Sequence, residues 1–374
     1  MYKIAVYAIC KNEIHNVDEW MKNVQEADYI CVLDTGSTDG TYEKLLEYQQ
    51  KDPQKYIIQQ KTYNPWRFDE ARNDSMKLIP TDASICVCTD FDERLAANWS
   101  DLVKGAWFDE CIVCFYMYAH DFTENGEPSR TIWYCKIHSN SNKWHWQYPL
   151  HEILYHEDYK DQPFPQEVTC IIPGPFVLLK HYHSKHNGTD YLELAKLRHE
   201  ENKQDETSAV YLAHEYFYRG KFEECTEYIK NVLLKEYDFK NQLFLTSTYM
   251  FLGKALMILN RAEEAKDAFQ KGIQADPTYR DNYLCLAQYY ASLGQYEQVV
   301  TTVHECFQKS RHYWSWLEQP NTWDWIPWDL LTVGYYNIGA IDMAKFTSKI
   351  AHDMNPTDER IANNYKFFQS LTIG

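Results

Sequence analysis

The sequence predicts an α/β domain, with a mainly parallel sheet flanked by helices, followed by an all-α domain of helical repeats. In residues 1–188, short apolar β-type runs alternate with amphipathic segments. Residues 189–374 lack this alternation and repeat a helical pattern instead. A chain of 374 residues is also longer than one hydrophobic core normally supports, so two domains are expected.

The first domain begins with alternating strands and helices. Apolar strands are expected at 3–9, 29–34, 56–60 and 84–88, and amphipathic helices at 17–27 and 41–50. Continuous apolar strands joined by helices are typical of parallel sheets that are covered on both faces. The periodicity therefore predicts that this sheet lies in the middle of the domain.

Three of these strands end in polar motifs: CKNE, DTGSTDGT and TDFDE. Ligands of open α/β sheets bind beyond the carboxyl ends of the strands, so we expect Asn12, Glu13 and Asp34 to face one crevice. The glycines, hydroxyl residues and acid of DTGSTDGT also suit a plain turn and helix cap. Position at a strand end is what favours a ligand site.

The motif TDFDE places Asp90 and Asp92 one residue apart after an apolar run. Carboxylates at i and i+2 of an extended chain point the same way, and Mg²⁺ or Mn²⁺ binds one or two carboxylates together with phosphate oxygens. Asp92 is the candidate metal ligand, and Asp90 is expected to contact a ribose or a metal-bound water. Glu93 fits a supporting position or the first acid of a helix. Arg72 fits a contact with a nucleobase or phosphates, or a structural ion pair.

The second domain repeats with a period of 34 residues, the tetratricopeptide period. LNRAEEA (259–265) and LGQYEQV (293–299) differ by this offset, and RGKFEEC (219–225) and IGAIDMA (338–344) are weaker copies. The last copy follows an insertion of 11 residues in a tryptophan-rich segment. These tryptophans favour a partner-binding surface, and the alternative is a domain that only supports the first.

Composition narrows the class of partner and the compartment. A formal net charge of −17 argues against broad contact with nucleic acid or anionic lipid. The sequence has no transmembrane segment or secretory signal, and its 11 scattered cysteines suit reduced thiols. Cys111 and Cys114 would face opposite sides of a strand, which disfavours a metal or redox pair. We therefore expect a soluble cytoplasmic protein.

In their order and spacing, AICKNE, VLDTGSTDGT, FDEARN and TDFDE resemble family 2 glycosyltransferases of the GT-A fold. The resemblance covers about the first 185 residues and implies an inverting, metal-dependent transfer from a nucleotide-diphosphate sugar, which we expect to be UDP-linked. It implies a nucleoside site lined by Ile9, Asn12, Glu13, Asp34 and Arg72. It also assigns the diphosphate and a Mn²⁺ or Mg²⁺ ion to Asp90 and Asp92. Many relatives carry a second acid where this chain has Thr35, so the carboxylate that contacts the base stays open.

A general base is expected in KWHWQYPLHEILY, because an inverting transfer must deprotonate the acceptor. The segment resembles one found in family members related to lipopolysaccharide core transferases. Glu152 is the candidate base, with His151 as its orienting group or an alternative base; otherwise Glu152 opens a helix. Trp144 and Trp146 fit stacking on sugar faces or burial in the core.

Late histidines complete the metal shell in some GT-A enzymes, and LLKHYHSKHNG supplies His181 and His183 on one face of an extended chain. A neutral imidazole suits Mn²⁺. His183 is slightly preferred over His181, and the alternative for both is a hydrogen-bonded surface histidine.

The two-domain layout is similar to that of bacterial enzymes that glycosylate peptide cysteines. We expect a glycosyltransferase at 1–188 and a repeat domain at 189–374 that binds the acceptor, a protein partner or a second copy. A glycan, a lipid-linked sugar and a peptide or protein are all open as acceptors. The alternative from another class is a scaffold with an inactive transferase half.

Overall fold

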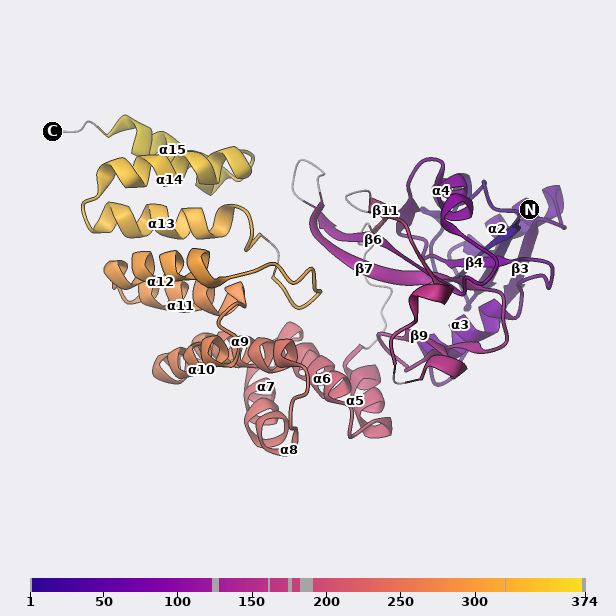
Figure 1. The fold of residues 1–374 in the computed structure, drawn as a ribbon, viewed down its shortest axis with the longest axis horizontal. Helices are drawn as coiled ribbons and strands as arrows, with labels where there is room; N and C mark the ends of the chain where they lie inside the picture. Colours follow the sequence, from indigo (N-terminus) through magenta and orange to yellow (C-terminus); the bar gives the residue numbers. More distant parts are fainter. Residues whose placement is uncertain are drawn as a thin grey trace. The chain divides into compact units, whose positions relative to one another are not determined.

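The computed structural model describes residues 2–122, 128–160, 162–173, 177–181, 191–319 and 321–371. The chain folds into two compact units (Figure 1). The N-terminal unit is Met1–Asp121 with Arg130–Arg198, and the helical unit is Phe122–Ser129 with His199–Gly374. The division after Arg198 falls within helix α5 (Tyr191–Glu201), further along the chain than the predicted boundary after residue 188.

Side-chain contacts explain why the first part of α5 belongs to the N-terminal unit. Arg198 Nη1 donates hydrogen bonds to the carbonyl oxygens of Leu150 and His151, both at 2.7 Å. Tyr191 stacks on Phe68, with ring centroids 6.2 Å apart. A boundary drawn from composition misses such contacts, because they join residues far apart in the sequence.

The main sheet of the molecule is mixed, with a parallel part at its N-terminal end. Its strands are β1 (Ile4–Cys10), β2 (Tyr29–Asp34), β3 (Tyr56–Gln60), β4 (Ile85–Cys88), β5 (Glu93–Leu95), β6 (Val113–Phe122), β7 (Pro128–Ser139), β10 (Thr169–Ile171) and β11 (Val177–His181). The order is β3-β2-β1-β4-β7-β6-β11-β5, and β10 pairs with β6. Strands β3, β2, β1 and β4 run parallel, whereas β7 is antiparallel to β4. The predicted α/β fold is confirmed.

Both faces of the parallel strands are covered. Helices α1 (Val17–Asn23), α2 (Thr41–Lys51) and α4 (Trp99–Ala106) contribute to one core cluster, and α3 (Phe68–Met76) packs on the other face near β8 (Trp144–Gln147) and β9 (Ile153–His156). Short 3₁₀ turns lie at Glu157–Tyr159 and Gln166–Val168. All seven residues of β1 are buried, as expected for a continuous apolar strand between two layers of the fold.

The strand order places three polar motifs side by side. Strand β1 lies between β2 and β4, so the order of the strands changes direction there, and Cys10 pairs with Asp34 at the end of the β1–β2 ladder. In open α/β sheets such a switch point opens a crevice at the carboxyl ends of the strands. CKNE, DTGSTDGT and TDFDE all follow strands that end at this edge.

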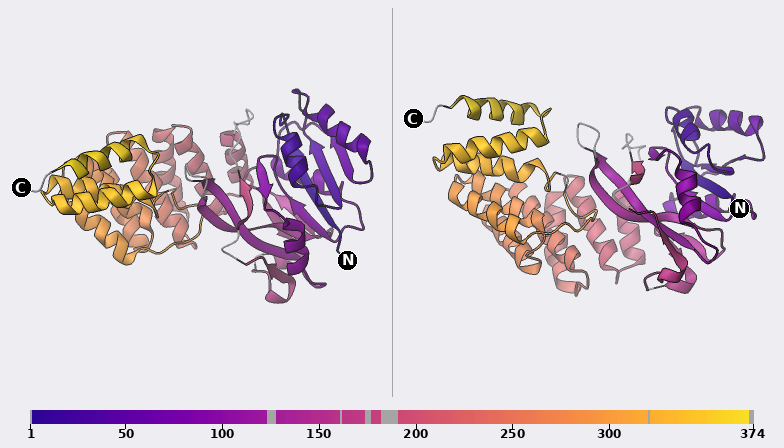
Figure 2. Two further views of the ribbon diagram at one scale, coloured as in Figure 1. Left: turned by 90° about the horizontal axis from the view of Figure 1, so that it is seen from above. Right: turned by 45° about the horizontal axis from the view of Figure 1, so that its top comes forward.

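The helical unit is a row of helix pairs (Figures 1 and 2). Its helices are α6 (Glu206–Tyr218), α7 (Phe222–Tyr228), η3 (Ile229–Leu233), α8 (Leu234–Glu236), α9 (Gln242–Ile258), α10 (Ala262–Ala275), α11 (Arg280–Ser292), α12 (Tyr296–Lys309), α13 (Trp325–Asn337), α14 (Ile341–Met354) and α15 (Glu359–Ser370). Neighbouring helices share two apolar clusters that continue along the row. The predicted tetratricopeptide-like architecture is confirmed.

The turn inside each pair has one residue in the left-handed region. Gly220, Gly294 and Gly339 have φ angles of 71°, 70° and 82°, and Asn260 has 58° in the equivalent place. Glycine adopts this conformation without steric cost, and asparagine is among the residues that tolerate it best. The geometry of the turn therefore explains why the second residue of each aligned segment (219–225, 259–265, 293–299 and 338–344) is glycine or asparagine.

The tryptophan-rich segment between α12 and α13 is mostly packed within the helical unit. Trp316 stacks on Tyr211 of α6 at 4.8 Å, and Arg280 of α11 lies 3.6 Å from the ring centre of Trp323. Only Trp314 among its tryptophans has a largely exposed side chain, at 50%. Most of the excess of tryptophan is thus explained by internal packing, which weakens the expectation of an exposed aromatic binding surface.

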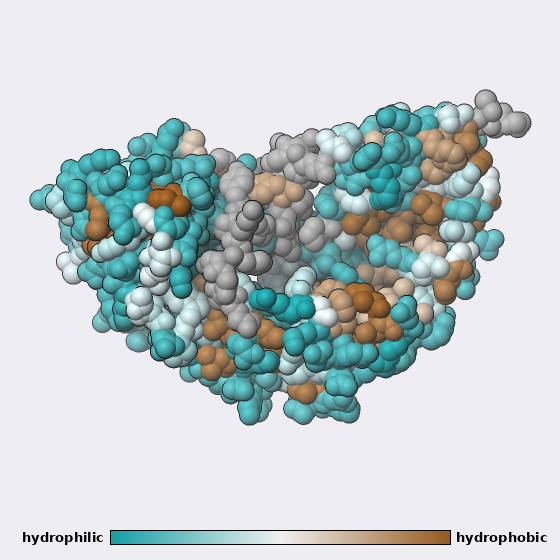
Figure 3. Space-filling model, turned by 180° about the vertical axis from the view of Figure 1, so that it is seen from behind, coloured by the Kyte–Doolittle hydropathy of each residue, from teal (hydrophilic) through white to brown (hydrophobic). Residues whose placement is uncertain are grey.

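Exposed apolar side chains are more common on the helical unit than on the N-terminal unit. Figure 3 shows apolar residues on one face of the molecule. The most exposed ones described on the helical unit are Tyr218, Ile258, Phe346 and Trp314, each at least half exposed. None of the helices in the described ranges combines the length and hydropathy required to cross a bilayer.

Candidate active site

The motifs after β1 and β2 hold each other by hydrogen bonds. Asn12, with a φ of 58°, accepts a bond at Oδ1 from Thr38 N, and its own N–H donates to Ser37 Oγ; both distances are 2.8 Å. Glu13 N donates to Thr41 Oγ1 at 2.8 Å. The segments that follow the two strands are therefore adjacent, and a shared ligand crevice there stays a prediction.

Asp34 organises the loop that follows β2. It is fully buried, and its Oδ1 accepts hydrogen bonds from the backbone N–H groups of Gly36 and Ser37 at 2.9 Å and from Gln60 Nε2 at 2.8 Å. Ser37 Oγ also donates to its Oδ2. The carboxylate of Asp34 is therefore buried beneath the turn, where it accepts hydrogen bonds from the turn residues, and is not at the surface.

Ile9 lies near the end of β1, and Glu13 lies in the segment that follows it. Ile9 is 8% exposed and packs with Leu33 and Ala71. Burial raises the pKa of the Glu13 carboxyl, and the negative charges of Asp92 and Asp90 raise it further. Glu13 therefore belongs to the same electrostatic environment as the DFD motif.

Asp90 is held by two cations from different elements. Arg72 Nη2, on α3, donates to Asp90 Oδ1 and Oδ2 at 2.8 and 3.1 Å, and Lys136 Nζ, on β7, donates to Oδ2 at 3.2 Å. Burial alone would raise the pKa of Asp90, but the charges of Arg72 and Lys136 outweigh it and keep that pKa below its usual value. Asp90 is therefore a charged group whose position is fixed by the protein.

Glu93 is a structural member of this network, a role that sequence reasoning left undecided. It is the first residue of β5 rather than of a helix, and it is 2% exposed. Its Oε2 accepts from Asp90 N at 2.9 Å, and its Oε1 accepts from Lys136 Nζ at 3.0 Å and Tyr118 Oη at 2.9 Å. Glu93 thus closes the turn that carries the two aspartates.

Lys136 was not identified from the sequence, although a signal was present. It is the only charged residue in the run TIWYCKIHS, and it is 6% exposed on β7. A lysine in an otherwise apolar or aromatic strand requires a buried acid as partner, because an unpaired buried charge is costly. The sequence could have predicted that a partner existed, but not that it would be Asp90 and Glu93.

Asp92 pairs with His181, the last residue of β11. The distance from His181 Nε2 to Asp92 Oδ2 is 3.3 Å. Burial lowers the pKa of His181, but hydrogen bonding to Asp92 and the nearby carboxylates raise it above its usual value overall. His183 lies outside the described residues.

The Asp92 and His181 pair fits a divalent cation that also binds phosphate. Two ligand atoms at right angles, each about 2.1 Å from an ion, are about 3 Å apart, which is close to the observed separation. A carboxylate oxygen with an imidazole nitrogen suits Mn²⁺. Within the described ranges no cluster of three or more protein ligands forms, so phosphate oxygens and water would complete such a shell.

Glu152 and His151 precede β9, and Glu152 does not open a helix. Glu152 Oε1 accepts a hydrogen bond from Arg72 Nε, and its side chain is 11% exposed. His151 has a φ of 50°, and its carbonyl is held by Arg198. Arg72 therefore links the candidate base to Asp90.

Trp144 and Trp146 are core residues of β8, exposed by 4% and 3%. Trp146 Nε1 donates to Tyr7 Oη at 3.0 Å, and its ring lies 5.2 Å below the guanidinium carbon of Arg72. Of the two alternatives for these rings, burial is the one that the geometry favours. The ring of Trp146 therefore packs against Arg72.

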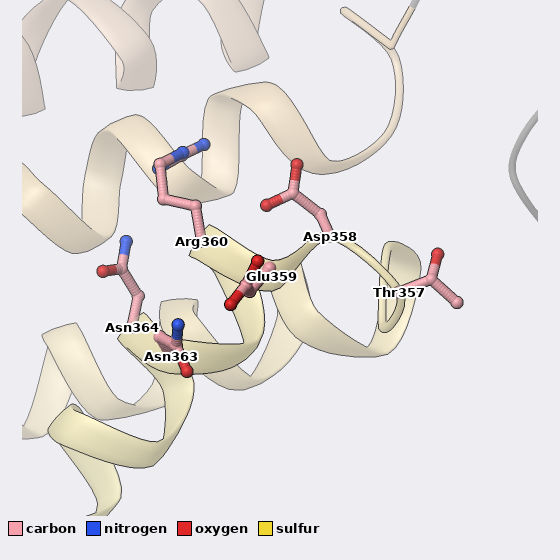
Figure 4. Close-up of a pocket in the computed structure, with 6 residues that line it drawn as sticks. All are labelled: Thr357, Asp358, Glu359, Arg360, Asn363 and Asn364. Atoms are coloured by element: carbon pink, nitrogen blue, oxygen red, sulfur yellow. The ribbon is translucent and has the colours of Figure 1, made fainter.

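A shallow hollow of about 640 Å³ at the start of α15 contains none of the predicted site residues (Figure 4). Its lining is Thr357, Asp358, Glu359, Arg360, Asn363 and Asn364. These side chains serve the end of the helical unit, where Arg360 pairs with Asp329 at 2.9 Å.

The fold and the site define an α/β domain with acidic groups at a switch point of its sheet, suited to a phosphorylated ligand and a divalent cation. Residues 6–182 match the model of glycosyl transferase family 2. The N-terminal unit is therefore a family 2 glycosyltransferase domain. The comparison with curated proteins finds no match.

Solved structures similar to this chain are tetratricopeptide-repeat proteins, among others. A thermophilic TPR protein of Thermus thermophilus is 19% identical, with a TM-score of 0.37, over 48% of this chain and 89% of that one. MamA of Desulfovibrio magneticus RS-1, from residue 41 to its end, is 15% identical, with a TM-score of 0.35, over 48% and 85%. The first TPR domain of human RPAP3 is 14% identical, with a TM-score of 0.29, over 34% and 91%.

Proposed function

We propose that the N-terminal unit transfers a sugar from a nucleotide-diphosphate sugar to an acceptor, with inversion at the anomeric carbon. The observation that carries this proposal is the joint placement of Asp92 with His181 and of Glu152 with Arg72 and Asp90. One group of residues suits the diphosphate leaving group, and the other suits deprotonation of the acceptor. UDP is the nucleotide that we expect.

The site residues have different roles in the proposed reaction. Glu152 accepts the proton of the acceptor as the acceptor attacks the anomeric carbon opposite the leaving diphosphate. Asp92 and His181 would hold a Mn²⁺ or Mg²⁺ ion, which supplies positive charge to the leaving group when bound. Asn12, Glu13 and the loop shaped by Asp34 line the nucleoside end, with Ile9 below them. His151 remains the alternative base.

The acceptor is a glycan, a lipid-linked sugar or a peptide or protein side chain. The tetratricopeptide-like unit favours a partner with its own surface, because such arrays present extended faces for binding. If the acceptor is a peptide held there, the full chain is expected to glycosylate peptides in preference to free sugars. A peptide array offered together with simple glycosides measures this preference.

The function is tested by a thermal-shift screen of UDP, GDP and dTDP sugars, with and without Mn²⁺. At a hundred times its dissociation constant, the donor should raise the melting temperature by about 5–10 °C. Asp92→Ala should abolish the part of the shift that needs Mn²⁺, whereas Asp158→Ala, in an exposed pair with Lys143, should keep it. NMR of the product then reports the anomeric configuration.

Two results would contradict the proposal. If, with Mn²⁺ present, no nucleotide sugar stabilised the full chain or was hydrolysed by it, the N-terminal unit would be an inactive scaffold. If Asp92→Ala kept an intact metal-dependent shift, the assignment of the metal to Asp92 would be wrong.

A further inference from the structure

Arg72 has a protein partner on each of its three guanidinium nitrogens. Nε donates to Glu152 Oε1, Nη1 to Cys88 Sγ at 3.3 Å, and Nη2 to both carboxylate oxygens of Asp90. The residue is 4% exposed. These bonds occupy at most four of the five N–H donors of the guanidinium. Because the residue is almost fully buried, a nucleobase or phosphate has little access to the remaining donor.

The two carboxylates that Arg72 joins come from distant parts of the chain. Asp90 follows β4, and Glu152 precedes β9, whereas Arg72 is on α3. The planar fork of arginine can bind two carboxylates at fixed relative angles, which the single ammonium of lysine cannot do. Arg72 therefore connects the DFD motif to Glu152 directly.

Asp90 is also fixed from its other side. Lys136 bridges Asp90 and Glu93, and Glu93 accepts the backbone N–H of Asp90. Below Arg72, the ring of Trp146 limits movement of the guanidinium. Asp90 is thus held by partners other than Arg72 as well.

We propose that Arg72 is a positioning residue that couples Asp90, on the donor side, to Glu152, the base, and is not a contact for the nucleotide. The proposal rests on the function proposed above. Arg72 keeps its charge in this setting, since burial lowers its pKa but the charges of Asp90 and Glu152 raise it well above the usual value.

The bridge also selects which oxygen of Glu152 takes the acceptor proton. In the described part of the chain, the hydrogen bond to Glu152 falls on Oε1. Oε2 is therefore the oxygen to which the proposal assigns the acceptor proton. When water replaces the acceptor, its proton passes to Oε2 while its oxygen bonds to the anomeric carbon and the nucleoside diphosphate leaves with the electron pair.

The test is Arg72→Lys in the full chain, with two separate measurements. Calorimetry with UDP and Mn²⁺ reports binding of the leaving group, and hydrolysis of the nucleotide sugar found in the screen reports the chemistry. We expect the affinity for UDP to stay within about threefold and hydrolysis to fall about 100-fold, because small misplacements of a reacting group have effects of that size. Arg67→Lys, at the N-cap of the same helix and paired with Asp69, is the matched control and should change neither measurement.

A double-mutant cycle with Glu152→Gln isolates the coupling. If Arg72 acts through Glu152, Arg72→Lys should change hydrolysis by less than about threefold once Glu152 is replaced. A loss of the same size in both backgrounds would overturn the proposal. A tenfold or greater loss of UDP affinity in Arg72→Lys would also overturn it, in favour of a nucleotide contact.

A milder variant covers the case in which Arg72→Lys does not fold. Trp146→Phe removes part of the support below the guanidinium and should lower hydrolysis with UDP affinity retained; unchanged hydrolysis would count against the proposal. Failure of the proposed function has a different signature, since the wild-type chain itself would then neither bind UDP with Mn²⁺ nor hydrolyse a nucleotide sugar.

Discussion

In the N-terminal unit, Asp90, Glu93 and Glu152 share the cations Arg72 and Lys136 in one connected network. In the helical unit, buried polar groups form smaller sets that include backbone atoms: Asp281 accepts from Gln319 N at 2.8 Å, and Thr246 Oγ1 donates to Gly272 O at 2.8 Å.

The two units differ in how their buried polar groups are arranged because they have different structural requirements. A reaction that moves charge needs groups at fixed separations in a low-dielectric site, so loss of one member affects all the others. A row of helix pairs needs only close contact between neighbours, so each defect should stay near its own repeat. The predictions below test this contrast, from the largest expected effect to the smallest.

Lys136→Met should destabilise the N-terminal unit by about 3–5 kcal/mol, because it leaves Glu93 buried without its cation. Lys143→Met is the control, since Lys143 pairs with Asp158 where both side chains are about half exposed and should cost at most about 1 kcal/mol. Urea unfolding followed by circular dichroism measures both. A loss below about 1 kcal/mol for Lys136→Met would mean that the network is not a cooperative unit.

Asp281→Asn should make the helical unit less sensitive to pH. Asp281 is 1% exposed, and burial raises its pKa to about 6. The folded state therefore binds a proton that the unfolded state has already released between pH about 4 and 6, so stability falls as pH rises through this window.

Above pH about 6 the buried charge costs up to about 3 kcal/mol, which the neutral asparagine avoids while it can still accept from Gln319 N. The variant should thus match the wild type at pH about 4 and exceed it at pH about 7 in urea unfolding. Asp267→Asn, an exposed acid paired with Lys271, is the control. Equal differences at both pH values would show that Asp281 is not the titrating group.

Gly253→Ala should destabilise the pair α9 and α10 by about 1–3 kcal/mol through overpacking. A Cβ at Gly253 would lie 2.3 Å from the ring of Phe269, whereas one at Gly105 of α4 would meet no atom within 4 Å. Gly105→Ala should instead stabilise by about 0.4–1 kcal/mol. Thermal unfolding of the two variants gives opposite signs if the close helix contact is real, and equal signs would contradict it.

Asp358→Ala should loosen only α15, by about 1 kcal/mol. Asp358 caps the helix by accepting from Ile361 N at 2.9 Å, and Figure 4 shows its side chain beside the first turn. Hydrogen exchange of the α15 amides should speed up while that of α9 stays constant. Glu359→Ala, next to the cap, should have an effect of a few tenths of a kcal/mol; faster exchange throughout the unit would argue against local behaviour.

Much of the fold was predictable because it depends on local periodicity. The strands at 29–34 and 56–60 were predicted at their observed bounds, and the repeated helical pattern of the second unit also followed from spacing. The boundary between the two units was harder to predict from the sequence. Arg198 belongs to the N-terminal unit because it bonds to carbonyl groups some 47 residues away in the chain.

The sequence by itself determined the order of the motifs, their place at the ends of β1, β2 and β4, and the 34-residue period, because each depends on residues close together along the chain. Only the tertiary structure decided the partners of the buried charges. Arg72 reaches Glu152 across 80 residues, and Lys136 reaches Asp90 across 46. A buried charge must find an opposite charge, but packing of the whole unit selects which one it finds.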